Sequence, residues 1–265
     1  MRKLYFPQLA TGAIAQYPIR KTKLARTVKN VLSDGTMILY PDPDAGLLVW
    51  QLAYVNLSAE DLEAIQAHFS NCIGRFHAFT FIDPTDNMLV SSSDLTALVW
   101  QTSSLIEITP GAADPDGGSS AFIVTNTGQA SQMISQSLAV PGDYQYCFSL
   151  YVNSAEASTI TLARSGTSTE ERASVPVKPG WNRIVSSGRL NDSGVMFTVA
   201  ISLAPGQRVE LYGFQLEAQI SPSRYRPTAK TAGIYSNAHW AVDELTVIAE
   251  APTLFSTSFS IETAV

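Results

Sequence analysis

Apolar and polar residues alternate over much of this 265-residue chain. Over residues 20–54, β-branched and aromatic residues occur in runs that are separated by an Asp-Gly and a Pro-Asp-Pro-Asp sequence, both of which are turn signals. Trp50, Leu52 and Tyr54 recur at every second position, which places their side chains on one face of a sheet. The pattern predicts antiparallel strands.

Residues 58–74 have helical periodicity instead. Ser58 can accept a hydrogen bond from a first-turn amide, Asp61 lies at the matching capping position, and Gly74 suits a left-handed residue after the last turn. The apolar stripe of this predicted helix is Leu62, Ile65 and Phe69. We therefore expect one amphipathic helix that lies across a sheet face, followed by an aromatic strand that ends where Asp83 precedes Pro84.

After residue 89 the composition shifts to Ser, Thr, Gly and Ala, and the apolar runs become short. Three Pro-Gly pairs, which begin at residues 141, 179 and 205, separate several of these runs. Eight short strands at this spacing predict a two-sheet sandwich. The expected strands lie in residues 106–110, 121–128, 132–140, 143–154, 158–166, 181–190, 196–204 and 208–218.

Residues 229–265 return to longer alternating strands, with Trp240, Leu245, Val247, Phe255 and Phe259 as the large apolar residues. This pattern is that of the first segment. The sequence therefore predicts a mainly β protein with one helix, in which residues 1–90 and 229–265 form a discontinuous β-sandwich or barrel domain. Residues 91–228 form a jelly-roll sandwich inserted into it, which is tolerated because a compact insert with adjacent ends adds little loop-closure entropy.

Composition and charge exclude several classes of function. Hydrophobic residues make up 45% of the chain, which is enough for real cores, whereas charged residues make up only 15%, compared with about 25% in typical soluble domains. A net charge of -6 and a pI near 5.1 provide no basic field for nucleic acid or an anionic membrane. No apolar stretch is long enough to span a bilayer, and we expect no signal peptide. Cys72 and Cys147 are expected to be buried free thiols.

The flanking parts carry a family resemblance. Residues 48–87, "LVWQLAYVNLSAEDLEAIQAHFSNCIGRFHAFTFIDPTDN", and residues 233–248, "GIYSNAHWAVDELTVI", resemble tail-tip proteins of long-tailed bacteriophages, close to the distal tail protein group. That resemblance implies a ring of identical subunits, commonly a hexamer, that joins the tail tube to other tail-tip proteins. It places the protein at the virion tail tip of a phage or prophage, after assembly in the host cytoplasm.

The central part carries a second resemblance. Residues 144–154, "YQYCFSLYVNS", residues 180–188, "GWNRIVSSG", and residues 209–228, "VELYGFQLEAQISPSRYRPT", resemble jelly-roll modules of the carbohydrate-binding type. Such modules are often attached to phage tail proteins and polysaccharide-degrading enzymes. The resemblance implies that the insert contacts a host surface polysaccharide, and modules of this type often hold a structural calcium ion.

Candidate glycan-binding residues follow from chemistry, because sugars need aromatic faces beside polar groups. We select Tyr144, Tyr146, Arg164 and Gln132. In residues 143–152, Tyr144, Tyr146 and Phe148 share one face, whereas Cys147, Ser149 and Tyr151 share the other, so either set can be exposed.

Candidate calcium ligands are Glu107, Asp114 and Asp116, because "DPDGGSS" at residues 114–120 offers carboxylate and carbonyl oxygens in a tight glycine-rich loop. A plain glycine-rich turn is the alternative. No other cofactor is expected.

Catalytic motifs are not found. His68, His77 and His239 lack a G-x-S-x-G or H-E-x-x-H context, and no opposed carboxylate pair can be located. We expect a non-enzymatic structural subunit of a phage tail tip whose inserted module binds a surface glycan. A stand-alone carbohydrate-binding protein is the alternative, and a glycan-cleaving enzyme is a third hypothesis.

Overall fold

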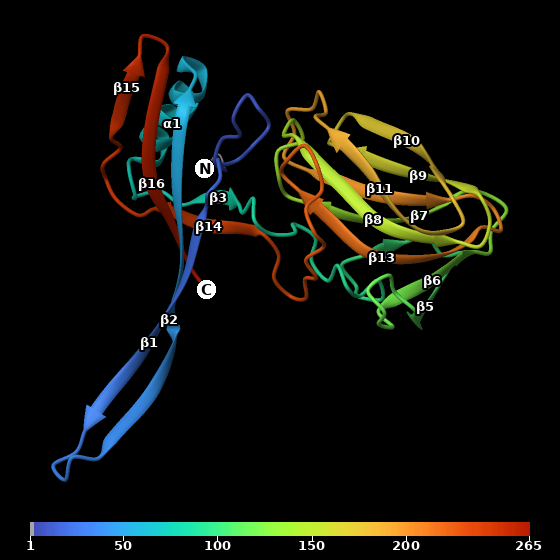
Figure 1. Ribbon diagram of the computed structural model, residues 1–265, viewed down its shortest axis with the longest axis horizontal. Helices are drawn as coiled ribbons and strands as arrows, with labels where there is room; N and C mark the ends of the chain where they lie inside the picture. The colour runs from blue at the N-terminus through green and yellow to red at the C-terminus, as the bar shows by residue number, and fades with distance from the viewer. Residues whose placement is uncertain (1–2) are drawn as a thin grey trace. The chain divides into compact units, whose positions relative to one another are not determined.

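The computed structural model describes residues 3–265 and divides into two compact units (Figure 1). Unit 1 contains the chain up to Ile82 and resumes for Ile234–Val265, whereas unit 2 is Asp83–Gly233. The boundaries expected from sequence, 90/91 and 228/229, both lie inside unit 2. The reason is that the two segments connecting the units pair with each other through backbone hydrogen bonds. The Asp83 amide donates to the Gly233 carbonyl at 2.8 Å, and the Ser91 amide donates to the Ala229 carbonyl at 2.7 Å.

Unit 1 is built on a six-stranded antiparallel sheet with the order β1-β2-β16-β14-β3, in which β15 also pairs with β16. β16 pairs with β2 from Phe255 to Ala264, so a strand from the end of the chain lies in the middle of a sheet that begins near Arg20. The strands are β1 (Arg20–Val31), β2 (Met37–Leu57), β3 (Phe79–Ile82), β14 (Ile234–Trp240), β15 (Val247–Ala251) and β16 (Leu254–Ala264).

Helix α1 (Ala59–Cys72) packs against β2 and β16. It begins as the sequence predicts, because the Ser58 hydroxyl accepts a hydrogen bond from the Asp61 amide at 3.1 Å. Its buried residues are Leu62, Ile65, His68 and Cys72. Phe69, which we expected in the buried stripe, is only half-buried, and His68 takes its place in the core.

The β1–β2 hairpin continues far beyond its packed base, and its distal part runs away from the other strands of unit 1 (Figure 1). The predicted Pro-Asp-Pro-Asp turn is wrong, because residues 41–44 lie within β2. A register shift between Leu24 and Arg26 absorbs the extra residues there. An irregular position of this kind tolerates proline, which lacks the amide that a regular ladder requires.

Unit 2 consists of two five-stranded antiparallel sheets, with the orders β10-β9-β12-β7-β4 and β11-β8-β13-β6-β5. Their bounds are β4 (Gln101–Thr102), β5 (Ile106–Ala112), β6 (Ala121–Asn126), β7 (Gln132–Leu138), β8 (Tyr146–Ser154), β9 (Ser158–Ser165), β10 (Glu170–Val177), β11 (Gly180–Gly188), β12 (Phe197–Leu203) and β13 (Arg208–Glu217). The core of unit 2 includes the fully buried side chains Tyr146, Phe148, Leu150, Val152, Ile160, Leu162, Phe197, Val199, Ile201 and Leu211. The predicted fold class, mainly β with one helix and a sandwich, is confirmed.

Two strands of unit 2 escaped sequence prediction, the short β4 and the edge strand β10. β10 begins with Glu-Glu-Arg and contains Pro176, a composition that the outermost strand of a sheet tolerates. The Pro-Gly pairs separate strands as expected, and Gly180 and Gly206 have φ values of 88° and 71° that favour glycine. Among residues 3–265, no helix is long and apolar enough to cross a membrane.

Candidate functional site

The outer face of the β11-β8-β13 sheet carries two adjacent rows of large side chains. In one row Arg183, Tyr151 and Tyr212 lie directly opposite one another across the three strands. In the next row Trp181, Asn153 and Glu210 do the same. Residues directly opposite in an antiparallel pair project to the same side. We call these six half-buried residues the aromatic face.

Strand alternation explains why these side chains point outward. In β8, Leu150 and Val152 are fully buried between the sheets, so Tyr151 and Asn153 must project to the other side. In β13 a register shift between Tyr212 and Gln215 places Gly213 at a φ of 68°. A Cβ at Gly213 would lie 3.0 Å from Cδ2 of Tyr151 and 3.3 Å from Cγ of Tyr225, so glycine leaves room for these two rings beside the strand.

Tyr212 is the centre of the aromatic cluster. Its ring centroid lies 5.9 Å from that of Tyr151, 6.4 Å from that of Trp181 and 5.2 Å from that of Tyr225. The corresponding interplanar angles are 49°, 74° and 69°. The rings are therefore mutually inclined and present a faceted apolar surface.

Polar groups surround these rings. The Asn153 side-chain amide donates to Oε2 of Glu210 at 2.7 Å, and the Tyr212 hydroxyl donates to Oδ2 of Asp116 at 3.0 Å. Burial and the neighbouring Asp116 carboxylate raise the pKa of Tyr212, so its hydroxyl stays protonated at neutral pH. Hydrogen-bond donors and carboxylate acceptors thus lie beside the rings on the same face of the sheet.

Arg183 has a supporting position within the aromatic face. Its guanidinium carbon lies 5.3 Å from the Tyr151 ring centroid, and Nη2 donates to the Ser149 hydroxyl at 3.0 Å. The buried Nε has no hydrogen-bond partner among the described residues. A cation over an aromatic ring fixes the orientation of that ring, so Arg183 holds Tyr151 in place.

The four glycan-binding residues predicted from sequence do not converge. Tyr146 is fully buried, where its hydroxyl donates to the Pro141 carbonyl at 2.8 Å, and Tyr144 is half-buried beside it with ring centroids 6.3 Å apart. Arg164 is only 5% exposed. Gln132 is half-buried at the start of β7, in the other sheet.

Arg164 is a bridge inside the sandwich. Its Nε donates to the Ser186 hydroxyl of β11 at 3.0 Å, and Nη2 pairs with Oε2 of Glu171 at 2.6 Å. Removal from water lowers the pKa of Arg164, while Glu171 opposes that shift. Its position suits a link between the two sheets and leaves no guanidinium at the surface.

The three predicted calcium ligands do not form one cluster, although Asp114 and Asp116 share a loop. Both carboxylate oxygens of Asp114 accept backbone amides of its own loop, from Asp116 at 3.0 Å, Gly118 at 2.8 Å and Ser120 at 3.0 Å. These hydrogen bonds lower the pKa of Asp114. Glu107 lies near the far end of β5, about 17 Å along the strand from Ala112. Within residues 3–265, no three His, Cys, Asp or Glu side chains gather closely enough to hold a metal ion.

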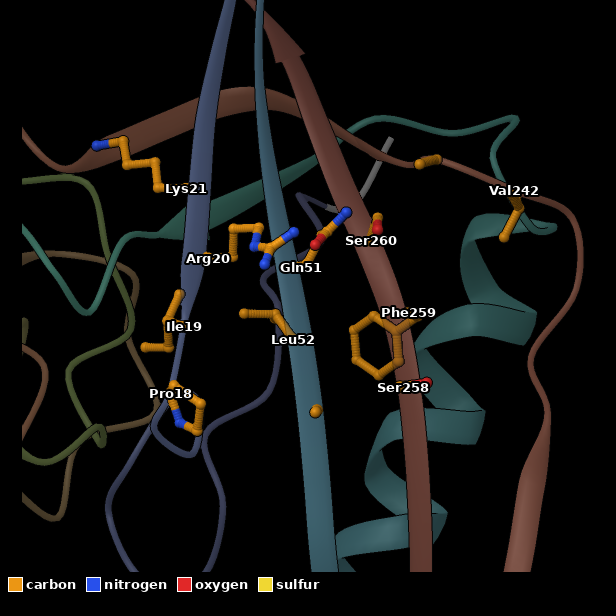
Figure 2. Close-up of a pocket in the computed structure, with 12 residues that line it drawn as sticks. Pro18, Ile19, Arg20, Lys21, Gln51, Leu52, Val242, Ser258, Phe259 and Ser260 are labelled. Atoms are coloured by element: carbon orange, nitrogen blue, oxygen red, sulfur yellow. The ribbon is translucent and has the colours of Figure 1, made fainter.

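Unit 1 contains a separate concavity, a trough of about 980 Å³ on the sheet face opposite α1 (Figure 2). Arg20, Gln51 and Ser260 form a cross-strand row along it, and Ala53 and Ser258 form the next row. The side chains of Ala53, Ser258 and Ser260 are short and leave the floor of the trough low. Pro18, Ile19 and Val242 also line the trough.

Comparisons with known proteins give limited information. No family model matches the sequence, and no curated protein matches it. Among solved structures, the xylan-binding domain of Paenibacillus barcinonensis Xyn10C is similar over 54% of this chain and 99% of its own, at 15% identity and a TM-score of 0.42.

Two other solved structures are similar over about half of the chain. A two-module fragment of Clostridium thermocellum xylanase 10B is covered over 28% of its length and covers 51% of this chain, at 17% identity and a TM-score of 0.41. Bacteriophage CBA120 tailspike protein 4 is covered over 22% and covers 52%, at 10% identity and a TM-score of 0.40. Similarity at this level assigns no ligand and no residue role to this chain.

Proposed function

We propose that unit 2 binds a polysaccharide chain on its aromatic face. The observation that carries this proposal is the convergence of Trp181, Tyr151 and Tyr212 with the polar groups of Asn153 and Glu210 on adjacent rows of one sheet. Sugar rings have apolar C–H faces and polar rims, so a ligand of this class uses aromatic rings and hydrogen-bonding groups together. The candidate residues for binding are therefore those of the aromatic face, and not Tyr144, Tyr146, Arg164 and Gln132.

We further propose that unit 1 assembles identical copies into a ring, as a structural subunit of a phage or prophage tail tip. Two features support this role. The flanking segments resemble distal tail proteins, and the distal β1–β2 hairpin leaves Val31 and Leu39 61% and 58% exposed. A two-stranded ribbon is marginally stable in water on its own, so a ribbon with exposed apolar residues favours a partner that covers it.

The two roles fit one another energetically. A ring presents several aromatic faces to one surface, and linked sites can gain about 10²–10⁴ in avidity over a single site. Weak binding by each sandwich would then suffice for attachment to a host surface polysaccharide. We propose tail-tube and tail-tip proteins as the other partners, a location at the virion tail tip, and no catalytic activity.

The binding proposal is tested by calorimetric titration of the full chain with polysaccharides that are first identified on a glycan array. We expect Trp181→Ala and Tyr212→Ala each to weaken binding about tenfold or more, since a contact worth about 1.4 kcal/mol corresponds to a tenfold change. Tyr144→Ala is the matched control, because it removes a half-buried tyrosine outside the aromatic face. Equal affinity of all three variants and the native chain would exclude the aromatic face.

The stand-alone carbohydrate-binding hypothesis makes a different prediction for assembly. Sedimentation velocity of the native chain at increasing concentration separates the two: we expect a closed oligomer, whereas a stand-alone binder stays monomeric. Electron microscopy of purified tails checks the position of the ring at the tip. A chain that is monomeric and absent from virions would remove the tail-tip role while leaving the glycan-binding proposal intact.

A further inference from the structure

We propose that the trough of unit 1 in one copy holds the tip of the β1–β2 hairpin from a second copy. This inference rests on the self-assembly proposed above and names the surfaces that make the contact. The tip is residues 31–37, "VLSDGTM", and the trough is the concavity in Figure 2.

The tip is a preformed turn with an apolar surface. The Leu32 amide donates to the Thr36 carbonyl at 2.8 Å, and the Gly35 amide donates to the Leu32 carbonyl at 2.9 Å. Val31, Leu32 and Met37 are 61%, 47% and 52% exposed. Such a turn loses little conformational entropy when it is bound, and its apolar side chains gain from burial.

The tip carries one negatively charged side chain. Asp34 is its single acidic residue, and Oδ1 of Asp34 accepts the Thr36 amide at 2.9 Å. This hydrogen bond lowers the pKa of Asp34, so the carboxylate is ionised at neutral pH. The tip therefore presents a fixed negative charge among apolar side chains.

The trough is complementary to the tip in charge and in its apolar lining. Its lining includes the apolar residues Pro18, Ile19 and Val242, the cations Arg20 and Lys21, and no acidic residue. In Figure 2 the Arg20 side chain lies beside that of Gln51 over the floor, whereas Lys21 is directed away from them. Arg20 is exposed and has no ion-pair partner among residues 3–265.

Two acidic residues close in sequence to residues that line the trough, Asp243 after Val242 and Glu262 after Ser260, form no ion pair with Arg20. Oδ1 of Asp243 accepts the Arg75 amide at 2.9 Å, and Oε1 of Glu262 lies 3.4 Å from Nη2 of Arg75. Asp243 thus accepts the main-chain amide of Arg75, and Glu262 pairs with the guanidinium of the same residue. Arg20 is therefore a positive charge among apolar side chains, and it can pair with a carboxylate that is itself flanked by apolar residues.

A chain cannot place its own tip in its own trough. Arg20 begins β1 and Val31 ends it, so the tip lies about 35 Å along a paired strand from the trough wall. The occupant must therefore come from another copy. Because the tip and the trough are different surfaces, the contact is head-to-tail, and repetition of it closes into a ring when the rotation between copies permits.

Charge exchange tests the contact in the full chain. We expect Asp34→Lys and Arg20→Glu each to raise the concentration needed for assembly about tenfold or more, because like charges would then face each other. The double variant should recover most of the native association. Asp143→Lys and Lys178→Glu are matched controls at exposed positions of unit 2 and should associate as the native chain does.

Cross-linking identifies the surfaces directly. Ser33→Cys in one tagged chain and Val242→Cys in a differently tagged chain should form a disulfide-linked heterodimer when the two are mixed, because a disulfide requires Cα atoms within about 7 Å. The native Cys72 and Cys147 are fully buried and should stay unreacted. Ser33→Cys mixed with Ser193→Cys, an exposed position of unit 2, should give no heterodimer.

The outcomes separate this contact from self-assembly itself. Oligomers that form without the 33–242 cross-link, or a double charge variant that stays as weak as the single ones, would overturn tip-in-trough docking and leave self-assembly standing. A chain that stays monomeric at every concentration would overturn both. Folding of each variant is checked by its thermal unfolding, which should match that of the native chain.

Discussion

Units 1 and 2 are both β structures, but they differ in how completely they bury their surfaces. In unit 2 the two sheets pack face to face, and residues 218–228, the covering segment, pack over the end of β13. Unit 1 packs one face of its sheet with α1 and leaves a long ribbon and a trough open. This contrast is the reason why we propose self-association through unit 1 and glycan binding by unit 2.

The covering segment of unit 2 is held by a buried polar network. Glu217 is 1% exposed, and its carboxylate accepts hydrogen bonds from the side-chain amides of Gln215 at 2.7 Å and Gln219 at 3.0 Å. It also accepts the backbone amide of Ser223 at 3.0 Å and the Ser223 hydroxyl at 2.5 Å. The Gln215 side chain in turn accepts the Arg226 amide at 2.7 Å. We call this network the clasp. The clasp gives residues 215–226 of this motif a structural role, whereas Tyr212, earlier in the same motif, belongs to the aromatic face.

The largest effect is expected from the aromatic core of unit 1. Trp240 is fully buried, and its indole N–H donates to Nδ1 of His68 at 3.2 Å. Replacing a buried tryptophan with alanine leaves a cavity, so Trp240→Ala should destabilise unit 1 by about 3–5 kcal/mol. Calorimetry should show an early transition for unit 1 and an unchanged one for unit 2. A uniform shift of both transitions would mean that the units do not unfold separately.

A second large effect is expected in the clasp. Glu217→Ala removes the acceptor of several buried donors, and each unsatisfied group costs about 1–3 kcal/mol, so we expect a loss of about 3 kcal/mol in the free energy of unfolding of unit 2. Glu156→Ala, at an exposed turn position, is the control and should change little. Denaturant titration measures both. If Glu217→Ala were as stable as the control, the clasp would be dispensable.

Acid should distinguish the two units. His68 is 6% exposed, and burial lowers its pKa to about 4, against about 6.5 in an unfolded chain. Between these values the unfolded state binds more protons, so the contribution of His68 is complete above pH 6.5 and is lost as the pH falls toward 4. Unit 1 should lose about 2 kcal/mol between pH 7.5 and pH 5. The groups that face His68 are Trp240, Cys72, Phe6 and Phe79.

Unit 2 should resist the same change in pH. Backbone amides of Ser168, Gly194 and Thr169 lower the pKa of Asp192 to about 2, so its contribution to stability is lost only as the pH falls below about 3.8 toward 2. Thermal unfolding at several pH values, followed separately for the two transitions, checks the contrast. His68→Gln should flatten the response of unit 1. A native unit 1 with no response between pH 7.5 and pH 5 would contradict the assignment to His68.

A moderate effect is expected at the bulge under the aromatic face. Gly213→Ala adds a Cβ 3.0 Å from Tyr151 at a φ of 68°, which costs a non-glycine residue about 1–2 kcal/mol. Because the added Cβ would displace the Tyr151 and Tyr225 rings, which both pack on Tyr212, glycan affinity should also fall. Gly206→Ala, which has φ 71° and open space around its Cβ, is the matched control and should lose stability without losing affinity. Equal affinity losses in both variants would show that the effect is general.

The smallest effect on stability is expected in the ribbon. Val31→Thr combined with Leu39→Thr changes two exposed side chains, so the free energy of unfolding of the monomer should change by less than about 0.5 kcal/mol. Assembly should nevertheless weaken, because the exposed apolar area that a partner would cover is reduced. Sedimentation and thermal unfolding measure the two quantities. A loss of stability with unchanged assembly would reverse the interpretation of the ribbon.

Much of the fold could be predicted from local pattern. The cap at Ser58, the eight strands of the sandwich and the Pro-Gly connections depend on near neighbours in sequence, and these predictions are confirmed. β10 could not be found, because an edge strand needs few apolar residues to hold its place. The Pro-Asp-Pro-Asp segment lies in a strand and not in a turn. Its irregular pairing is set by the register of the partner strand β1, which local sequence does not show.

The aromatic face could not be assembled from sequence. Alternation in β8 correctly separates Tyr146 from Tyr151, but it does not tell which of the two faces water. Trp181, Tyr151 and Tyr212 come from three strands, and only the register between those strands brings them into adjacent rows. A search for exposed aromatics would also have passed over Glu210, whose role comes from its place opposite Asn153.

Intrinsic fluorescence tests the central claim, glycan binding at the aromatic face, most directly. Trp50, Trp100 and Trp240 are buried, whereas Trp181 lies half-exposed on the aromatic face and should report a bound ligand. Titration with a polysaccharide that binds should change the emission of the native chain, and Trp181→Phe should abolish that change. Undiminished binding by a Trp181→Ala, Tyr212→Ala double variant would contradict the account.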